Sequence, residues 1–345
     1  MLHRVCPPFR WLISSALLLM GVIGHAPPAD AATTCSASTL PLLFGSVTGD
    51  TPVDGSSQVS IECNTLGLSL LGRARVRMCL NIGDGTGGTA GTVDRFMDSP
   101  DGDSLRFQIY RDSARTLIWG STDTPARPTP VHRDLEYEVP LLGGSGGTTV
   151  SMFGRIPAQE GLAAGDFESA LTGVHTRLDY RYNEYVLVLP SPFPDSCTSG
   201  GLGGGSISFG FIARATVPDR CTINAATDLD FGSVPGLIDA PVDQDATITL
   251  TCTRRTAWDV GLDNGQHAAG DTRRMQLDGG TSHVTYELFR DPARTLRWGS
   301  TPGTDAEPGE GTGFQQQVTV HGRVPAGQAV PAGQYRDTVT VTVTY

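Results

Sequence analysis

The last ten residues, 336–345, alternate between polar and apolar side chains. One face carries four threonines, and the opposite face carries Val339, Val341, Val343 and Tyr345. Period-two alternation of β-branched residues predicts a half-buried strand rather than a helix. The strand ends at the chain's own carboxylate, so we expect it to keep an open edge that can pair with another chain.

The remainder of the chain also predicts β-structure. Glycine (43 residues) and proline (23 residues) are abundant, and only 18% of the residues are charged, a composition that suits many short strands joined by turns. No long segment has the 3.6-residue period of an amphipathic helix. We therefore expect an all-β protein.

The N-terminus has the features of a secretory signal. Arg4 and Arg10 precede an apolar run over 11–23, and Ala29-Asp30-Ala31 follows, which matches an A-x-A cleavage site. The run is too short to span a bilayer as a helix. We expect residues 1–31 to be removed and the protein to be exported. The roughly 310 residues that remain suggest two domains of ordinary size.

The charge of the chain argues against two classes of binding partner. All 25 basic residues are arginines, and residues 32–345 contain 23 arginines against 35 acidic residues, a net charge of −12. An acidic chain without lysine argues against binding to nucleic acid or to an anionic membrane.

An internal repeat organises the chain. Three blocks occur twice in the same order: the Cys35–Cys63 and Cys221–Cys252 intervals, 110–121 and 289–300, and 150–157 and 318–325. Repetition of this kind indicates two copies of one domain. We expect a signal peptide at 1–31, an N-terminal domain at 32–217 and a C-terminal domain at 218–345.

Six cysteines remain after the leader is removed. An even number in an exported protein favours disulfides. The repeat pairs Cys35 with Cys63 and Cys221 with Cys252, each pair closing a loop worth about 3–4 kcal/mol. Cys79 and Cys197 then pair by elimination. No cysteine or histidine spacing matches a zinc site, so we expect no metal.

The repeated blocks resemble the spore coat U domain, which builds the subunits of archaic (Csu-type) chaperone–usher pili. The resemblance covers nearly all of the chain after the leader and rests on the FGS sequence between the first cysteines, YRDSARTLIWG at 110–120, GRIPA at 154–158 and DTVTVTVTY at 337–345. It implies two immunoglobulin-like β-sandwiches in tandem, the second an incomplete pilin-type sandwich. It also implies three partners: a periplasmic chaperone that supplies the missing strand, an outer-membrane usher, and an adjacent pilin subunit that later replaces the chaperone's strand.

The expected position of this subunit in a pilus depends on whether its chain can donate a strand. A donor strand needs roughly ten residues before the first cysteine, whereas only Ala32, Thr33 and Thr34 precede Cys35 after cleavage. The alternating segment 206–217 is expected to fill the donor position of the first domain in cis, which is nearly the same as being its last native strand. A chain that accepts a strand and donates none belongs at the pilus tip, and the resemblance identifies such two-domain subunits as adhesins. We expect attachment of cells to abiotic or host surfaces and support of biofilm formation.

Three insertions distinguish the first domain from the second: residues 66–73, about 136–147 and 181–205. With strands placed up to Cys63 and at 74–82, 104–110, 148–154, 167–180 and 206–217, the insertions fall in loops that share one end of the sandwich. Apolar loops there would suit surface contact. The candidate residues are Leu68, Leu70, Leu71, Leu141, Leu142, Val186, Leu187, Val188, Leu189 and Phe193. Residues 185–189 could instead form a buried strand, and 66–71 could begin the strand at 74–82.

Signals for an enzyme are weak. The literal GxGxxG at 83–88 is followed by no helical or βαβ pattern. We expect no cofactor and no catalytic activity. Two other functions stay open: a secreted coat or envelope protein that needs no pilus assembly, and a secreted hydrolase.

Overall fold

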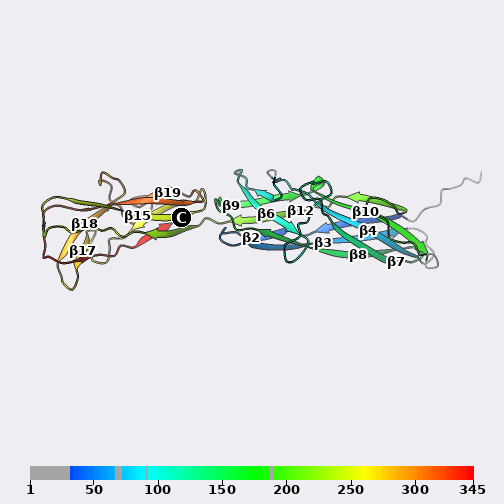
Figure 1. Ribbon diagram of the computed structural model, residues 1–345, viewed down its shortest axis with the longest axis horizontal. Helices are drawn as coiled ribbons and strands as arrows, with labels where there is room; N and C mark the ends of the chain where they lie inside the picture. Colours follow the sequence, from blue (N-terminus) through cyan, green and yellow to red (C-terminus); the bar gives the residue numbers. More distant parts are fainter. Residues whose placement is uncertain (1–31, 67–71, 90–91, 187–189) are drawn as a thin grey trace, which may run out of the picture.

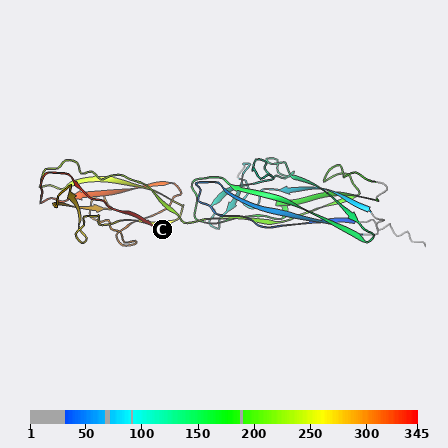
Figure 2. The same cartoon turned by 90° about the horizontal axis from the view of Figure 1, so that it is seen from below.

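The computed structural model describes residues 32–66, 72–89, 92–186 and 190–345. These residues form an all-β structure, and their helical content is the single 3₁₀ turn η1 (Gly173–His175). None of the described segments forms a helix that is long and apolar enough to cross a membrane. The strands build two sandwiches that lie end to end along the long axis of the molecule (Figures 1 and 2).

The first sandwich consists of an eight-stranded sheet in the order β1-β3-β8-β6-β5-β9-β12-β2 and a four-stranded sheet in the order β11-β10-β4-β7. Its strands are β1 (Ala32–Thr39), β2 (Leu42–Ser46), β3 (Val53–Leu66), β4 (Gly72–Ile82), β5 (Arg95–Asp98), β6 (Ser104–Tyr110), β7 (Val131–Val139), β8 (Gly143–Ile156), β9 (Gly165–Leu171), β10 (Thr176–Val186), β11 (Gly203–Ile207) and β12 (Phe211–Val217).

The second sandwich has a six-stranded sheet in the order β13-β15-β20-β18-β17-β22, a three-stranded sheet β19-β16-β23 and the short pair β14-β21. Its strands are β13 (Cys221–Ala226), β14 (Leu237–Ile238), β15 (Val242–Cys252), β16 (Ala257–Leu262), β17 (Arg273–Leu277), β18 (His283–Phe289), β19 (Glu307–Glu310), β20 (Gln315–Val324), β21 (Gln328–Ala329), β22 (Tyr335–Arg336) and β23 (Val341–Thr344).

Strand alternation produces a separate core in each sandwich. Along β4, Val76, Met78 and Leu80 are fully buried, while Arg75 and Arg77 lie on the outer face with Cys79. Strand β15 buries Ile248, Leu250 and Cys252 in the second core in the same way. Because successive side chains of a strand point to opposite faces, each strand contributes one apolar row to its core.

The repeated blocks have the same structural role in both sandwiches. The indole Nε1 of Trp119 donates to the Leu80 carbonyl at 2.8 Å, and that of Trp298 donates to the Val260 carbonyl at 2.7 Å. These bonds show that Leu80 and Val260 are equivalent positions. The repeated motif is therefore architectural.

In each copy, a glycine leaves room for apolar side chains of the segment that carries the FGS sequence. A Cβ on Gly154 would lie 2.6 Å from the Phe44 ring, and one on Gly322 would lie 2.3 Å from Leu229. A larger residue would displace these apolar side chains, which explains why GRIP and GRVP both begin with glycine.

The three expected disulfides, Cys35–Cys63, Cys79–Cys197 and Cys221–Cys252, are present. Three expectations about the strands are wrong. The stretches 167–180 and 206–217, each expected as one strand, are divided between β9 and β10 and between β11 and β12, and the two strands of each pair lie in different sheets. The third, the stretch 136–147, is not an inserted loop. Strand β7 pairs with β4 up to Val139 opposite Gly72, and β8 begins at Gly143, so only residues 140–142 connect them. Alternating charges on β7 pair with arginines on β4, and this cross-strand pairing stabilises β7 as a strand of the four-stranded sheet.

The sandwiches meet at a bonded junction. The Arg254 amide donates to the Leu162 carbonyl at 2.7 Å, and the Gly161 amide donates to the Gly313 carbonyl at 3.2 Å. Asp103, buried at this junction, forms ion pairs with both Arg254 and Arg255. Strand β12 leads into β13 through residues 218–220.

Candidate functional site

The two sandwiches differ in how deeply they bury the segment that carries the FGS sequence. In the first sandwich, Leu42 and Val47 are fully buried and Phe44 is 7% exposed. The repeat places Leu229, Phe231 and Val234 at the equivalent positions, and these three are only half-buried. The same apolar row is thus covered in one copy and partly open in the other.

The cover in the first sandwich is β12. It pairs antiparallel with β9 and parallel with β2, and it directs Phe211, Ala213, Ala215 and Val217 into the core. Strand β11 continues the same edge by pairing with β10 from Leu178 opposite Ile207 to Tyr182 opposite Gly203. The segment 206–217, singled out by its alternation, lies in these two strands.

No strand among the described residues of the second sandwich takes the place of β12. Strand β22 ends the six-stranded sheet and β23 ends the three-stranded sheet, and residues 227–235 belong to no strand. Two backbone edges therefore border the half-buried row of Leu229, Phe231 and Val234. We call this region the open groove.

The C-terminal strand lines the open groove. Val339, Val341 and Val343 are half-buried against the second core, and Tyr345 is 58% exposed. Val343 lies opposite Val260 on β16, as Leu178 lies opposite Leu80 on β4. Leu178 is fully buried beneath β11 whereas Val343 is not, which is the difference that an absent neighbouring strand produces.

The chemistry of the open groove suits an extended apolar segment. Its floor is a row of half-buried aliphatic and aromatic side chains, and its sides can bond a backbone in the manner of a sheet edge. A strand with alternating apolar residues would bury both its own apolar face and this floor.

A second candidate site lies at the far pole of the first sandwich. Leu66 is opposite Gly143, and Gly72 is opposite both Val139 and Val186. This register brings the ends of β3, β7 and β10 and the starts of β4 and β8 to one pole, at the end of the molecule away from the second sandwich (Figure 1).

Only some of the predicted pole residues belong to the described part of the chain. Leu141 is 54% exposed and Leu142 is 80% exposed in the β7–β8 turn, and Val186 ends β10. Phe193 lies elsewhere, over the outer face of β4, with the Arg75 and Arg77 guanidinium carbons 5.3 and 5.7 Å from its ring centre. The other predicted pole residues lie outside the described residues: Leu68, Leu70, Leu71, Leu187, Val188 and Leu189.

A ladder of ion pairs stiffens the sheet below this pole. Arg73, Arg75 and Arg77 on β4 face Glu136 and Asp134 on β7. Hydrogen bonds from the Tyr185 hydroxyl and from the Arg73 and Arg75 guanidinium groups lower the pKa of Glu136 to about 2. The alternating acids of DLEYE at 134–138 and arginines of RARVR at 73–77 are a sequence signal for this pairing that periodicity alone did not identify.

The segment 190–202 folds back onto this outer face. The Arg75 guanidinium donates to the Ser191 carbonyl at 2.7 Å, Asn183 Nδ2 donates to the Pro192 carbonyl at 2.8 Å, and Arg181 Nε donates to the Gly200 carbonyl at 2.7 Å. The largest insertion of the first sandwich is thus anchored along much of its length.

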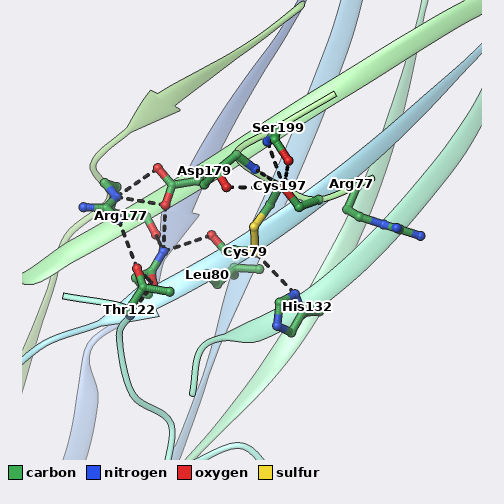
Figure 3. The surroundings of a disulfide bond; sticks show 12 residues. Arg77, Cys79, Leu80, Thr122, His132, Arg177, Asp179, Cys197 and Ser199 are labelled. Carbon is green, nitrogen blue, oxygen red and sulfur yellow. Dashed lines mark hydrogen bonds and ion pairs between the residues drawn. A yellow bond between two sulfur atoms is a disulfide. The ribbon is translucent and has the colours of Figure 1, made fainter. Parts of the chain in front are cut away.

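The Cys79–Cys197 disulfide ties the same segment to β4 (Figure 3). Its neighbour His132 places Nδ1 at 3.3 Å from Cys79 Sγ. Among the described residues, these three side chains have ligand atoms within 4.8 Å of one another, but sulfurs joined in a disulfide are not the thiolates that bind a metal.

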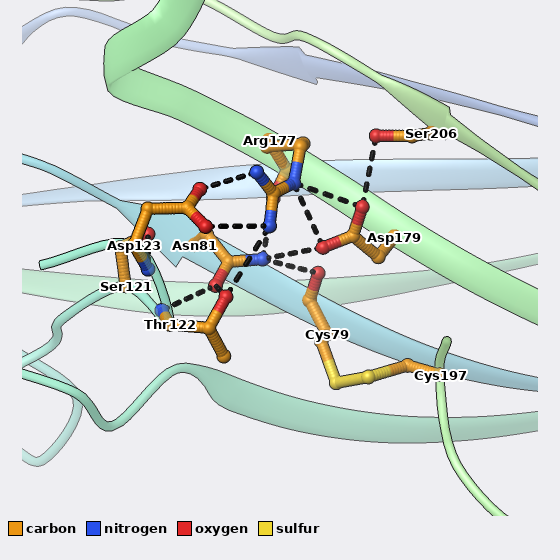
Figure 4. Close-up of polar contacts among 9 residues, drawn as sticks. All are labelled: Cys79, Asn81, Ser121, Thr122, Asp123, Arg177, Asp179, Cys197 and Ser206. Carbon is orange, nitrogen blue, oxygen red and sulfur yellow. Dashed lines mark hydrogen bonds and ion pairs between the residues drawn. A yellow bond between two sulfur atoms is a disulfide. The ribbon is translucent and has the colours of Figure 1, made fainter. Parts of the chain in front are cut away.

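A polar cluster lies next to the disulfide (Figure 4). Asn81 Nδ2 donates to Asp179 at 3.0 Å, Ser206 Oγ donates to the same carboxylate at 2.8 Å, and Arg177 Nε donates to it at 2.9 Å. Arg177 also pairs with Asp123, and the Thr122 amide donates to Asn81 Oδ1. The cluster binds the 121–127 loop and β11 to the sheet, which is a structural role.

The literal GxGxxG at 83–88 also has a structural role. It follows β4 as a loop whose Gly83 amide donates to the His175 carbonyl and whose Thr86 amide donates to the Ala170 carbonyl. No helix begins there.

Comparison with known proteins places these features in context. A family model described as the Spore Coat Protein U domain matches residues 26–173 and 207–342. Protein U of Myxococcus xanthus is 34% identical over 158 residues, which is 44% of this chain and 78% of that protein.

Two solved structures are similar over most of the chain. One is the CsuC–CsuE chaperone–tip adhesion subunit pre-assembly complex from archaic chaperone–usher Csu pili of Acinetobacter baumannii (18% identity, TM-score 0.47, 90% of this chain and 100% of that one). The other is the CupB6 tip adhesin from Pseudomonas aeruginosa (13% identity, TM-score 0.32, 91% of this chain and 94% of that one).

Proposed function

This chain belongs to the spore coat protein U domain family, and from this membership we propose that it is the tip adhesin subunit of a chaperone–usher pilus. One observation carries the proposal: the first sandwich has its covering strand, β12, within the chain, whereas the second sandwich has an open groove in the same place. A chain of this kind accepts one strand from outside.

The open groove is the assembly site in this proposal. A periplasmic chaperone fills it first, and the adjacent pilin subunit replaces the chaperone as the chain passes the outer-membrane usher. The main-chain edges provide hydrogen bonds to any strand, and the floor selects for alternating apolar residues. Val339, Val341, Val343 and Tyr345 line the edge that the incoming strand meets.

The direction of β12 supports a linear fibre. It runs antiparallel to β9 and leaves the first sandwich at the end where the second sandwich follows. A donor in the same orientation along β22 and β23 would leave the second sandwich at its far end. The next subunit would then extend the rod and leave the far pole of the first sandwich at the tip.

The N-terminal residues are consistent with a subunit that donates no strand. Ala32, Thr33 and Thr34 already pair with Leu66, Thr65 and Asn64 of β3. Cleavage after Ala31 would therefore leave a mature chain that begins inside its own sheet.

The adhesive surface is the far pole. Leu141 and Leu142 present exposed apolar side chains there, and β10 ends at Val186 in the same place. We assign this pole to contact with an abiotic or host surface, which would attach cells and support biofilm formation.

The proposal is tested by supplying the missing strand in cis. A second copy of residues 203–217 is fused after Tyr345 through a short Gly/Ser linker, which stays flexible. We expect this fusion to accumulate in soluble form without a chaperone and the second sandwich to melt at a higher temperature. The matched control is the same extension with its alternating apolar residues replaced by serine. Equal solubility and melting of the two fusions and the unmodified chain would reject the open groove as an acceptor.

The family description also leaves a secreted coat protein as a second candidate. Such a protein would be soluble and stable as a free chain without the fused strand. The unmodified chain of the same experiment therefore distinguishes the two functions.

A further inference from the structure

The Cys79–Cys197 disulfide differs in position from the other two. Cys35 and Cys63 are members of the first apolar core, and Cys221 and Cys252 are members of the second. Cys79 and Cys197 belong to neither core and lie on the outer face of β4. Reducing this bond would leave the covalent cross-link of each core in place.

The bond also has no counterpart in the second sandwich. Because Leu80 and Val260 are equivalent, Asp259 stands where Cys79 does. The second sandwich folds without a cross-link at this position, so the sandwich architecture does not require it. What the bond adds to the first sandwich is a tie to the segment 190–202.

Solvent reaches the disulfide from one side. An open depression of about 540 Å³ is lined by Cys197, His132, Arg77, Arg133, Asp134 and Asp195. Two arginines and two aspartates line the depression, and Arg77 pairs with Asp134, so the approach of an anionic nucleophile meets no excess of negative charge. A thiolate is such a nucleophile, and attack on a disulfide depends on access to one of its sulfurs.

A histidine imidazole lies beside the second sulfur. His132 Nδ1 lies 3.3 Å from Cys79 Sγ (Figure 3). A neighbouring imidazole stabilises a departing thiolate, either by donating its proton or by its positive charge. The two sulfurs therefore have different surroundings: Cys197 faces the depression, and Cys79 is 1% exposed and faces the histidine.

From this geometry we propose that Cys79–Cys197 is a thiol–disulfide exchange site, at which a dithiol releases the segment 190–202. One thiolate of the dithiol attacks Cys197 Sγ, a mixed disulfide forms, and the bond to Cys79 breaks. Cys79 leaves as a thiolate and takes a proton from the His132 imidazolium. The remaining thiol of the dithiol then bonds to the dithiol's other sulfur in the mixed disulfide, the bond to Cys197 breaks, and the proton of that thiol passes to Cys197. The protein disulfide gains two electrons and two protons, and the dithiol is oxidised to its disulfide.

The consequence for the fold is local. Without the covalent tie, the segment is held to the sheet by hydrogen bonds such as Arg75 to Ser191 and Arg181 to Gly200, and by Phe193 over the arginines. On an outer face, water competes for each of these hydrogen bonds. The inference does not depend on the pilus function, since it concerns only the chemistry of the isolated chain.

The test measures which disulfide opens first. The full chain is treated with a low concentration of dithiothreitol at neutral pH, alkylated at intervals and mapped by peptide mass spectrometry. We expect Cys79 and Cys197 to be labelled at a rate about tenfold or more higher than that of the four core cysteines. Simultaneous opening, or earlier opening of a core pair, overturns the proposal.

The role of His132 is tested separately. His132→Ala should slow the opening of Cys79–Cys197 about tenfold, whereas the control His283→Ala on β18 should leave it unchanged. Thermal unfolding of both variants shows whether the fold persists. A folded His132→Ala chain that opens at the original rate removes the histidine from the mechanism.

Release of the segment is read by hydrogen exchange. Reduced chain and a Cys79→Ser, Cys197→Ser double variant should both show faster amide exchange over 190–202, with β3 and β8 unchanged. Unchanged exchange over 190–202 in both samples would show that the disulfide does not hold the segment.

Discussion

Leu42 and Leu229 offer a direct test of the open groove, because one repeat position exists in two states of burial. Leu42 is fully buried beneath β12, and Leu229 is half-buried in the open groove. We consider the same substitution, leucine to alanine, at both positions.

The expected magnitudes follow from burial. Leu42→Ala should lower the free energy of unfolding of the first sandwich by about 2–5 kcal/mol. Leu229→Ala removes a side chain that is only half covered, so in the free chain it should lower the stability of the second sandwich by about 1–2 kcal/mol. Once a strand fills the groove, Leu229 becomes as buried as Leu42, and the remaining difference of about 1–3 kcal/mol should appear as a loss of about 5- to 150-fold in affinity for that strand.

The assay has two parts. Thermal and denaturant unfolding give the stability of each variant, and titration with a synthetic peptide of residues 203–217 gives the affinity of the second sandwich. Leu237→Ala is the control, because Leu237 is 64% exposed on β14 and should change neither quantity by more than about 0.5 kcal/mol. The reasoning is refuted if Leu229→Ala binds the peptide as tightly as the unmodified chain, or if it destabilises the free chain as much as Leu42→Ala does.

Three further predictions concern other parts of the molecule. Replacing Leu141 and Leu142 with serine should abolish attachment of cells to surfaces in an adhesion assay while pili still assemble, because both side chains are already more than half exposed; persistent attachment would exclude this turn from the adhesive surface. Arg95→Met should destabilise the first sandwich by about 3–6 kcal/mol in calorimetry, because the buried guanidinium donates to the Gly83, Ile82 and Trp119 carbonyls. The control is Arg106→Met, at a partly exposed arginine, which should cost about 1 kcal/mol or less. Equal losses of stability in the two variants would contradict the role of burial. The folded pKa of Glu136 is about 2, below its ordinary value of 4.5, so its contribution to stability is present above pH 4.5 and is lost as the pH falls toward 2; unfolding curves of Glu136→Gln should lack this part of the acid dependence, and an unchanged curve would show that Glu136 does not titrate in this way.

Much of the fold could be predicted because it depends on local periodicity and on repetition. The strand at 74–82 was predicted from its alternating apolar face, and the disulfides Cys35–Cys63 and Cys221–Cys252 from the two equivalent intervals. The pairing of Cys79 with Cys197 followed only by elimination, since 118 residues separate them and no local pattern connects them.

The errors and gaps arose where distant segments pair. The stretch 136–147 was expected to be a loop because the second copy lacks it, but its acidic residues pair with arginines of β4 and make it a strand. Phe193 was grouped with the pole by its place in an insertion, yet it packs over Arg75 and Arg77. The alternating charges of the first contact are present in the sequence, but nothing in the sequence shows which segments lie side by side, because each contact joins residues more than 60 positions apart.

The C-terminal strand shows how the two kinds of information divide. The alternation of Val339, Val341 and Val343 with threonine by itself determined that these residues form a strand with one apolar face, because side-chain direction in a strand depends only on the parity of position. The sequence alone also determined that the domain occurs twice. The family resemblance predicted that the second copy is incomplete, and the tertiary structure shows which side chains this affects: Leu42, Phe44 and Val47 are covered, whereas Leu229, Phe231 and Val234 are half-buried. The burial of a side chain depends on which strand lies next to it. Strand β12 covers this row in the first copy, and no described strand of the second copy takes the same place.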